Sequence, residues 1–401
     1  GKTSTSRIIE SLLRAHGLRT GLFTSPHLER FTERIMIDGE PAPDAAVADA
    51  WEEIAPFVDL VDAELASRDD APLTFFEILT VLAFVVAADA PVDVLVLEVG
   101  MGGAWDSTNT ADGDVAVFAP IDIDHADRLG DTIAEIATVK SGIIKDGAAV
   151  VSSRQPAEAE RVLRAAAAAK GATIAFEGEG FALVDQRLAV GGQQISVRGL
   201  AGTYDEEYLP LYGAHQGRNA ALAIAAVESL IGGGSRSIAT DVLSEALGQV
   251  TSPGRLQLVG AAPTVLVDAA HNPHGARALV SALRESFDFD EWGIVLGILA
   301  DKDAAGIVAE LATVAAHVFA TAPDSERAND ADTIADLVEA AGIPVTVHRD
   351  VADAAEAARE WAAGSDQAPH RRAVVIAGSV VLAGEALALA AAEDWKSGWE
   401  S

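Results

Sequence analysis

Residues 1–25 read GKTSTSRIIESLLRAHGLRTGLFTS, and this stretch indicates the fold. Its first three residues match the end of the pattern G-x-x-x-x-G-K-[ST], a loop that holds phosphates between a strand and a helix. Residues 4–16 predict that helix, because their apolar side chains recur at helical spacing and Gly17 is a stop signal. Residues 18–25 then predict a strand. The order is typical of an α/β nucleotide-binding domain.

Lys2 would lie at the N-terminus of this helix, where the helix dipole disfavours a positive charge. Bound phosphate would offset that cost. The tripeptide GKT is too short to be specific, so an ordinary helix N-terminus is the alternative. We expect the residues before Gly1 to complete the loop, and we expect a chain that starts at Gly1 to bind ATP poorly.

Strand-like and helix-like stretches alternate along most of the chain. The apolar runs are nearly continuous, as in parallel strands that are covered on both faces. Residues 172–211 instead predict short antiparallel strands. The Ser-Pro-Gly sequence at 252–254 predicts a linker, after which the α/β alternation starts again. We therefore predict an α/β protein with two domains, residues 1–252 and 253–401.

Composition excludes several classes of protein. The chain has 401 residues, 28 basic and 61 acidic, for a formal net charge of −33. Nucleic-acid binding requires a basic stripe, and none is present. No apolar run is long enough to span a membrane. The absence of cysteine excludes disulfides, thiolate zinc sites and a cysteine nucleophile, and it fits a cytoplasmic protein.

Polar side chains follow several predicted strands. Ser25, Glu98 and His125 each come where such a strand ends. Ligands of open α/β sheets bind at the carboxyl ends of strands, so these residues predict part of a Mg²⁺ site. Ser25 could instead cap a turn before Pro26, and His125 could be a structural hydrogen bonder. Glu98 ends a very apolar strand, where a buried carboxylate requires a partner.

Lys140 follows on a predicted helix. A lysine ammonium only donates hydrogen bonds and cannot coordinate a metal, so by itself Lys140 predicts an ion pair with a nearby acid.

In this order the motifs resemble folylpolyglutamate synthase/dihydrofolate synthase of the Mur ligase superfamily, in forms typical of actinobacterial members. The resemblance covers essentially the whole chain. TSPHL followed by ERI, and DAAHNP after SPGR, are specific to the family. The matching segments are GKTS, TSPHLERFTERI, TFFEILT, EVGMGGAWDSTN, IDIDHADRLGDTIAEIATVKSGIIKDG, GAHQGRNAALA, SPGRLQ, VDAAHNPHGA, ADKD and IAGSVVLAGEA.

The resemblance implies an N-terminal ATPase domain, with a parallel sheet plus a small antiparallel sheet, and a C-terminal Rossmann-like domain, with the active site in the cleft between them. It implies two Mg²⁺ ions and a carbamylated lysine, which becomes an oxygen-donor ligand. The implied metal ligands are Ser25, Glu98, His125 and the Lys140 carbamate. The implied ATP-binding residues are Gly1, Lys2, Thr3, Ser4, Asn219, Arg255, Asp268 and His271. The implied catalytic residues are Lys2, Glu98, His125, Lys140 and His271.

The implied reaction uses ATP to convert a pterin substrate's carboxylate into an acyl phosphate, which the α-amine of L-glutamate attacks. The acceptors would be dihydropteroate, reduced folates or both, and we expect a monomer because no exposed apolar repeat is evident. Phe75, Phe76 and Trp105 are candidates to stack on the pterin, with core packing as the alternative for the two phenylalanines. Asp106 is a further candidate substrate residue.

Four positions depart from the family pattern. Ala104 stands where Arg is common, Ser107 where Ala is common, and Val139 and Ser141 flank Lys140 where Glu and Ala are common. Loss of an arginine near the substrate loop could change the preferred substrate. Two alternatives remain: a related ligase that extends a cell-wall precursor, which would need a further domain, and a non-catalytic nucleotide-binding protein, which would be expected to lose some of these residues.

Overall fold

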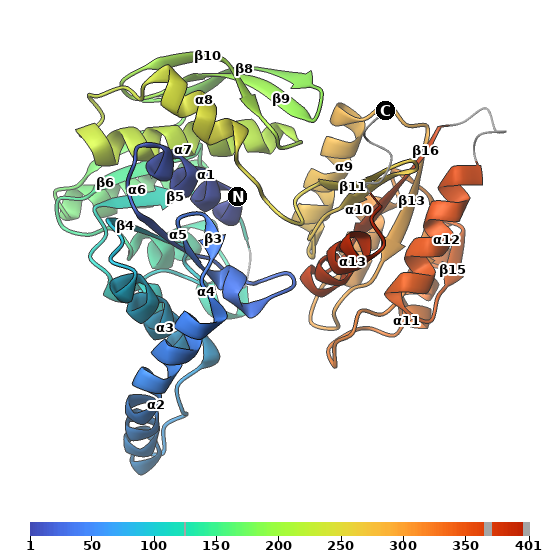
Figure 1. The fold of residues 1–401 in the computed structure, drawn as a ribbon, viewed down its shortest axis with the longest axis horizontal. Coiled ribbons are helices and arrows are strands. Elements are labelled where there is room, and N and C mark those ends of the chain that lie inside the picture. The colour runs from blue at the N-terminus through green and yellow to red at the C-terminus, as the bar shows by residue number, and fades with distance from the viewer. Residues whose placement is uncertain (124–125, 365–370, 396–401) are drawn as a thin grey trace. The chain divides into compact units, whose positions relative to one another are not determined.

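The computed structural model describes residues 1–123, 126–364 and 371–395. The chain forms two compact units, which we describe separately (Figure 1). Unit 1 comprises residues 1–27, 31–210 and 215–251. Unit 2 comprises residues 28–30, 211–214 and 252–401. The described residues include no helix of the length and apolarity needed to cross a membrane.

Unit 1 begins with the helix that the opening residues predict, and α1 spans Lys2–Ala15. It contains two separate sheets with parallel pairing. In one, β1 and β4 are parallel and β2 and β3 add antiparallel strands at the side of β1, in the order β3-β2-β1-β4. The elements of this part are β1 (Thr20–Phe23), η1 (Phe31–Arg34), β2 (Ile35–Ile37), β3 (Glu40–Pro41), α2 (Asp44–Ser67), α3 (Phe75–Asp89) and β4 (Val94–Leu97).

The second sheet is wholly parallel, in the order β5-β6-β7. Its strand β7 contains the residues 173–176 that the sequence analysis assigned to antiparallel strands, so that assignment was wrong. The Ala-rich helix α6 connects β6 to β7 and permits the parallel pairing. These elements are η2 (Ser107–Thr110), β5 (Val115–Phe118), α4 (Ala126–Leu129), α5 (Ile133–Ser141), β6 (Ala149–Ser152), α6 (Ala157–Ala169) and β7 (Thr173–Phe176).

A separate antiparallel sheet completes unit 1, as the sequence analysis predicted for most of residues 181–211. Its order is β10-β9-β8, and it lies beside helices α7 and α8 (Figure 1). The elements are β8 (Ala182–Ala189), β9 (Gly192–Arg198), β10 (Thr203–Leu209), α7 (Ala214–Gly232) and α8 (Thr240–Gly248).

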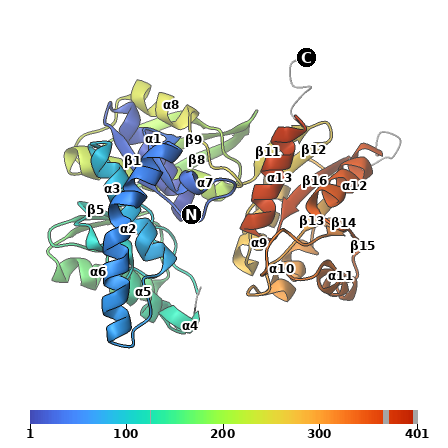
Figure 2. The same ribbon diagram turned by 60° about the horizontal axis from the view of Figure 1, so that its bottom comes forward.

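Unit 2 is a six-stranded sheet in the order β11-β12-β16-β13-β14-β15. Neighbouring strands in this sheet are parallel, except β11 and β12. These two strands form an antiparallel hairpin that was not predicted from the sequence. Helices cover both faces (Figure 2). The elements are β11 (Gln257–Ala261), β12 (Thr264–Val267), α9 (Pro273–Ser286), β13 (Glu291–Leu296), α10 (Ala304–Leu311), β14 (Ala315–Ala320), α11 (Ala331–Ala340), β15 (Val345–Val347), α12 (Val351–Ala363), β16 (Arg372–Ala377) and α13 (Val380–Ala392).

Strand β16 shows why this sheet has two cores. Successive side chains of a strand point to opposite faces. Val375 and its alternate neighbours pack into the core that includes α9, α10 and α11. Val374 and Ile376 pack into the core that includes α12 and α13. Both faces are therefore apolar, which explains the near-continuous apolar runs in the sequence.

Candidate active site

The first set of predicted residues lies where the N-terminus of α1 meets the end of β4. The Lys2 ammonium donates hydrogen bonds to the carbonyl oxygens of Val99 at 2.8 Å and Gly100 at 3.0 Å. The Thr3 hydroxyl donates to Glu98 Oε1 at 2.9 Å. Glu98 is buried, with 4% of its surface exposed. Lys2, Thr3 and Glu98 are thus brought together although 95 residues separate the last two.

Gly1 extends this arrangement to a second strand. A Cβ atom built on Gly1 would lie 3.5 Å from the Cβ of Ala119, which follows β5. The N-terminus of α1 therefore lies at the carboxyl ends of β4 and β5, where ligands of α/β sheets bind. Its backbone N–H groups and dipole favour an anion such as phosphate.

Ser25 lies at the same sheet edge as Glu98. Strands β1 and β4 are parallel, with Phe23 opposite Leu97, so Ser25 and Glu98 both follow the carboxyl ends of paired strands. The backbone N–H of Glu98 donates to the Phe23 carbonyl at 2.9 Å, which extends the pairing by one residue. Ser25 is half-buried. A serine hydroxyl and a carboxylate are oxygen donors of the kind that Mg²⁺ prefers.

The predicted metal set is only partly described. His125 lies outside the described residues. Across residues 1–123, 126–364 and 371–395, no three His, Asp or Glu side chains gather as a metal-binding group. The predicted set combines the Ser25 hydroxyl, the Glu98 carboxylate, His125 and the Lys140 carbamate. Glu98 is its only His, Asp or Glu side chain among the described residues.

Lys140 lies in the last turn of α5, and its backbone lies against the loop that follows β4. The N–H of Ala104 donates to the Val139 carbonyl at 2.9 Å. A Cβ atom on Gly103 would lie 2.7 Å from the carbonyl oxygens of Val139 and Lys140. Only glycine permits this approach. The loop that starts at Glu98 and the helix that carries Lys140 are therefore fixed to one another.

The predicted substrate residues differ in their surroundings. Asp106 is buried, and its carboxylate accepts hydrogen bonds from the N–H groups of Met101 at 2.9 Å and Thr108 at 3.0 Å. This carboxylate therefore organises its own loop. Trp105 is 55% exposed. Its indole lies against Gly102, where a Cβ atom would be 2.8 Å from the ring.

The two phenylalanines at the start of α3 also differ. Phe76 is half-buried, with its ring centroid 5.7 Å from that of Phe23, and its ring lies against Gly100. Phe75 is 59% exposed, beside Phe31 and under the Arg34 guanidinium. Phe76 thus packs partly into the core while it contacts the loop after β4, and Phe75 offers more of its ring to solvent.

A hydrogen-bonded chain connects α1 to α7. The Asn219 amide donates to the Gln216 side chain at 2.9 Å, and the Gln216 amide donates to Ser4 Oγ at 3.3 Å. All three side chains are buried. The predicted ATP-binding residues Ser4 and Asn219 are therefore joined through Gln216. Gln216 was not among the residues predicted from the sequence, although its i, i+3 spacing from Asn219 places both on one face of α7.

The second set of predicted residues lies on unit 2, around the carboxyl end of β12. Asp268 accepts hydrogen bonds from the N–H groups of Leu256 at 2.9 Å and Ala270 at 2.8 Å. Burial raises the pKa of the Asp268 carboxyl above its usual value, while the Arg255 charge and the two N–H groups act in the opposite direction. His271 Nδ1 donates to the Ala269 carbonyl at 2.9 Å, which leaves Nε2 as the ring's other polar atom.

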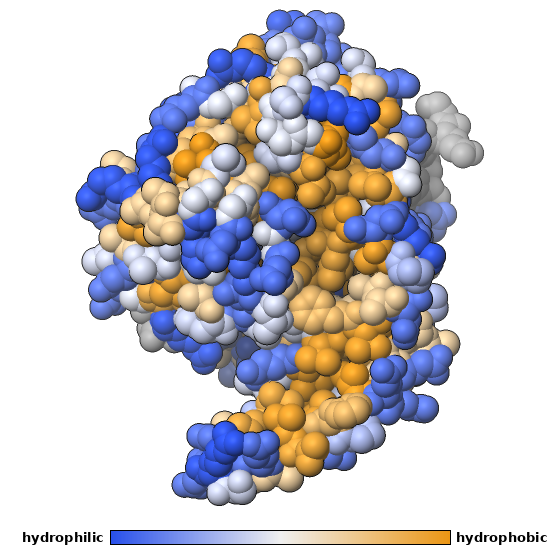
Figure 3. Space-filling model, turned by 90° about the vertical axis from the view of Figure 1, so that its left-hand side faces the viewer, coloured by the Kyte–Doolittle hydropathy of each residue, from blue (hydrophilic) through white to orange (hydrophobic). Residues whose placement is uncertain are grey.

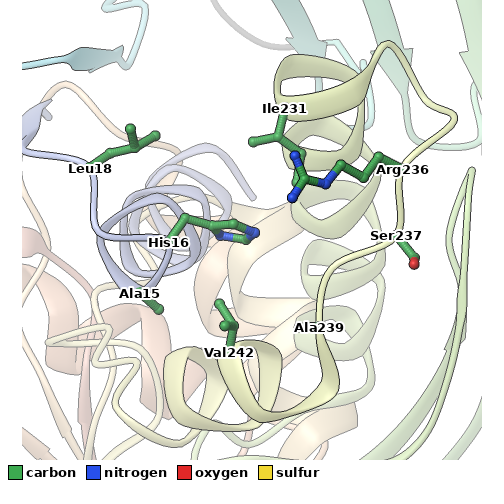
Figure 4. Close-up of a pocket in the computed structure, with 8 residues that line it drawn as sticks. All are labelled: Ala15, His16, Leu18, Ile231, Arg236, Ser237, Ala239 and Val242. Carbon is green, nitrogen blue, oxygen red and sulfur yellow. The ribbon is translucent and has the colours of Figure 1, made fainter.

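A pocket elsewhere in unit 1 contains none of the predicted site residues. Its volume is about 420 Å³, and it lies at the opposite end of α1 from Lys2. In Figure 4, His16 and Arg236 point toward one another across it, between the side chains of Ile231 and Val242. The predicted site therefore rests on the residues at the strand ends and not on this cavity.

Comparisons with known proteins give matches along both units. Residues 1–227 match the family model of the Mur ligase middle domain, and residues 254–380 match that of the Mur ligase glutamate ligase domain. The dihydrofolate synthase/folylpolyglutamate synthase of Mycobacterium tuberculosis is 43% identical, over 97% of this chain and 84% of that protein. The Bacillus subtilis protein of the same description is 33% identical, over 84% of this chain and 78% of that protein.

Solved structures give the same result. A folylpolyglutamate synthase of Mycobacterium tuberculosis, complexed with ADP and AMPPCP, superposes with a TM-score of 0.92 and covers 97% of this chain and 89% of that chain, at 43% identity. Escherichia coli FolC in complex with DHPP and ADP gives a TM-score of 0.82 over 98% of this chain and 87% of that chain, at 28% identity.

Proposed function

This chain belongs to the Mur ligase family and is an ATP-dependent ligase of its folylpolyglutamate synthase/dihydrofolate synthase group, and we propose that it joins L-glutamate to dihydropteroate and to reduced folates. The observation that carries the proposal is the meeting of Lys2, Thr3 and Glu98 at the ends of β4 and β5. This arrangement has the chemistry of a phosphate and metal site, and it occurs in a family of amide-forming ligases.

We propose that the reaction has two steps. A carboxylate oxygen of the pterin substrate attacks the γ-phosphorus of ATP, and ADP leaves. The α-amine of glutamate then attacks the acyl carbon, phosphate leaves with its bridging oxygen, and the amine loses a proton as the amide forms. No enzyme nucleophile is needed. The work of the protein is to position the groups and to neutralise the charge on the transferred phosphoryl.

Lys2 is proposed to neutralise part of the negative charge on the transferred phosphoryl group. Its ammonium is exposed and is held at the strand edge by the Val99 and Gly100 carbonyl oxygens. These bonds orient the ammonium beside the N-terminus of α1, where a terminal phosphate would be bound. A preorganised cation in such a position stabilises developing negative charge without rearrangement.

Ser25 and Glu98 are proposed to hold Mg²⁺ together with His125. Their hydroxyl and carboxylate groups fit the ion, and the Thr3 hydroxyl orients the Glu98 carboxylate. When bound, Mg²⁺ supplies charge neutralisation at the phosphate oxygens. Lys140, as a carbamate, is the proposed ligand of a second Mg²⁺. ¹³C NMR spectra of the protein in ¹³C-bicarbonate test this. A carbamate carbon signal should be present, and it should be lost in Lys140→Ala.

Asn219, Arg255, Asp268 and His271 are proposed to bind the nucleotide, the first from unit 1 and the others from unit 2. The prediction that both sets serve one ATP molecule stays a prediction. Phe76 and Trp105 are the proposed pterin contacts, while the hydrogen bonds of Asp106 support a role in positioning their loop.

The test restores the residues before Gly1 that the predicted phosphate loop requires. It follows ADP release and glutamylated product by mass spectrometry, with Mg²⁺, ATP and glutamate. One reaction contains 7,8-dihydropteroate and the other contains tetrahydrofolate. Glutamylation of both acceptors is expected. Glutamylation of only one would assign the specificity and make Ala104→Arg the first variant to study. If a folded protein released no ADP with either acceptor, the proposal would be refuted.

A further inference from the structure

The apolar stripe of α2 is longer than the core that covers it. In the first half of the helix, Val47, Ala50 and Ile54 are buried against α3 and the sheet of β1. In the second half, Phe57, Leu60 and Val61 are 66%, 67% and 38% exposed. These three positions are spaced i, i+3 and i+4, so they share one side of the helix. We call them the α2 face.

The figures show where this face lies within unit 1. The helix projects from the body of the unit in Figure 1. An apolar band continues onto the projecting part in Figure 3. The expectation that no apolar repeat is exposed was therefore wrong. Helical spacing shows which residues share a side, whereas the length of the body against which they pack is a tertiary property.

The charge around the α2 face is mostly negative. Residues 44–89, which contain α2 and α3, include eleven acidic residues and a single basic residue, Arg68. Arg68 already forms an ion pair with Glu64. An apolar face rimmed by acids suits an occupant with apolar side chains and a basic rim. A second copy of this chain would bring the same acidic helix and a net charge of −33, so electrostatic repulsion disfavours self-association through this face.

We propose that the α2 face is a docking surface for a basic amphipathic helix of a partner protein. Such a helix would place its apolar anchors on Phe57, Leu60 and Val61 and its lysines or arginines beside the acids of α2. This is the usual recognition of an amphipathic helix by an apolar surface. The surface lies outside the proposed site, so docking serves to place the enzyme and not to perform the reaction.

The probe is a synthetic 18-residue peptide of leucine and lysine with leucines at helical spacing. Its control has the same composition in an order that destroys the apolar stripe, because any cationic peptide is attracted to an acidic protein. Binding to the full chain is measured by titration calorimetry at 50 mM and 300 mM salt. The variant is Phe57→Ser with Leu60→Ser. The matched control is Val184→Ser, which changes a side chain that is 63% exposed on β8.

The helical peptide should bind more tightly than the scrambled one, and the double variant should weaken its binding by about tenfold or more. Val184→Ser should leave binding unchanged, and neither substitution should change glutamate ligation. Equal affinity for both peptides, or equal affinity of the double variant and the unchanged protein, would overturn the proposal. So would concentration-dependent dimerisation of the free protein that the double variant abolishes, because a second copy would then be the occupant.

Discussion

Gly103→Ala tests the contact between the loop after β4 and the helix that carries Lys140. A Cβ atom at this position would lie 2.7 Å from two backbone carbonyl oxygens and 2.9 Å from the Lys140 Cα. Ordinary contacts of this kind begin near 3.4 Å. Backbone cannot rotate aside as a flexible side chain can, so the loop and α5 must separate by about 0.7 Å.

The expected cost has two parts. Overpacking of a well-fitted contact destabilises a protein by about 1–3 kcal/mol. Separation also stretches the hydrogen bond from Ala104 N–H to the Val139 carbonyl, now 2.9 Å. A misplacement of about 1 Å can lower a rate on the order of a hundredfold, so we expect kcat/KM for glutamate ligation to fall about ten- to a hundredfold.

The matched control is Gly113→Ala. Gly113 lies in the same segment, and the nearest atom to its added Cβ would be the Val115 carbonyl oxygen at 3.9 Å. Urea denaturation measures the free energy of unfolding, and ADP release measures kcat/KM. Unchanged stability and turnover in Gly103→Ala would refute the contact. Lower stability with unchanged turnover would show that the register of loop and helix does not matter to the reaction.

Three further predictions concern other parts of unit 1. Glu98→Gln should abolish ATP turnover with little change in the free energy of unfolding, and unchanged turnover would contradict the metal assignment. Burial and the adjacent Arg34 charge lower the pKa of His27 in the folded protein, where its Nδ1 accepts a hydrogen bond from Arg34 Nε at 2.7 Å. The unfolded chain therefore binds a proton more readily than the folded one, and the free energy of unfolding should decrease as the pH falls below about 6.5, the usual pKa of histidine. His27→Gln should flatten that loss between pH 7.5 and 5, and equal slopes in denaturation series would contradict the link. Glu228 is buried and accepts hydrogen bonds from three backbone N–H groups of residues 200–202 and from the Tyr204 hydroxyl, so Glu228→Gln should cost about 2–3 kcal/mol by urea denaturation, whereas the exposed Glu245→Gln should cost nothing measurable.

The placement of several candidate site residues at one edge could be predicted, because parallel strands end at a common edge. Glu98 and Ser25 were predicted together from their places after apolar runs, and the pairing of β1 with β4 puts both at one edge. The opening residues predicted the helix that brings Lys2 and Thr3 to this edge. The neighbourhood of Gln216 was not found, because a glutamine in a helix carries no signal until its partner on another helix is known.

Local patterns in the sequence therefore determined most of the elements, the α/β class and the chemistry of the strand ends. These depend on the periodicity of side chains, on turn residues and on the unusual cost of a buried carboxylate. The tertiary structure decided matters that depend on packing between distant segments. It placed β7 in a parallel sheet, used the Asp106 carboxylate inside its own loop, and left Phe57, Leu60 and Val61 of α2 exposed. A side chain's surroundings are set by what packs against it, and no spacing along one helix or strand specifies its neighbour.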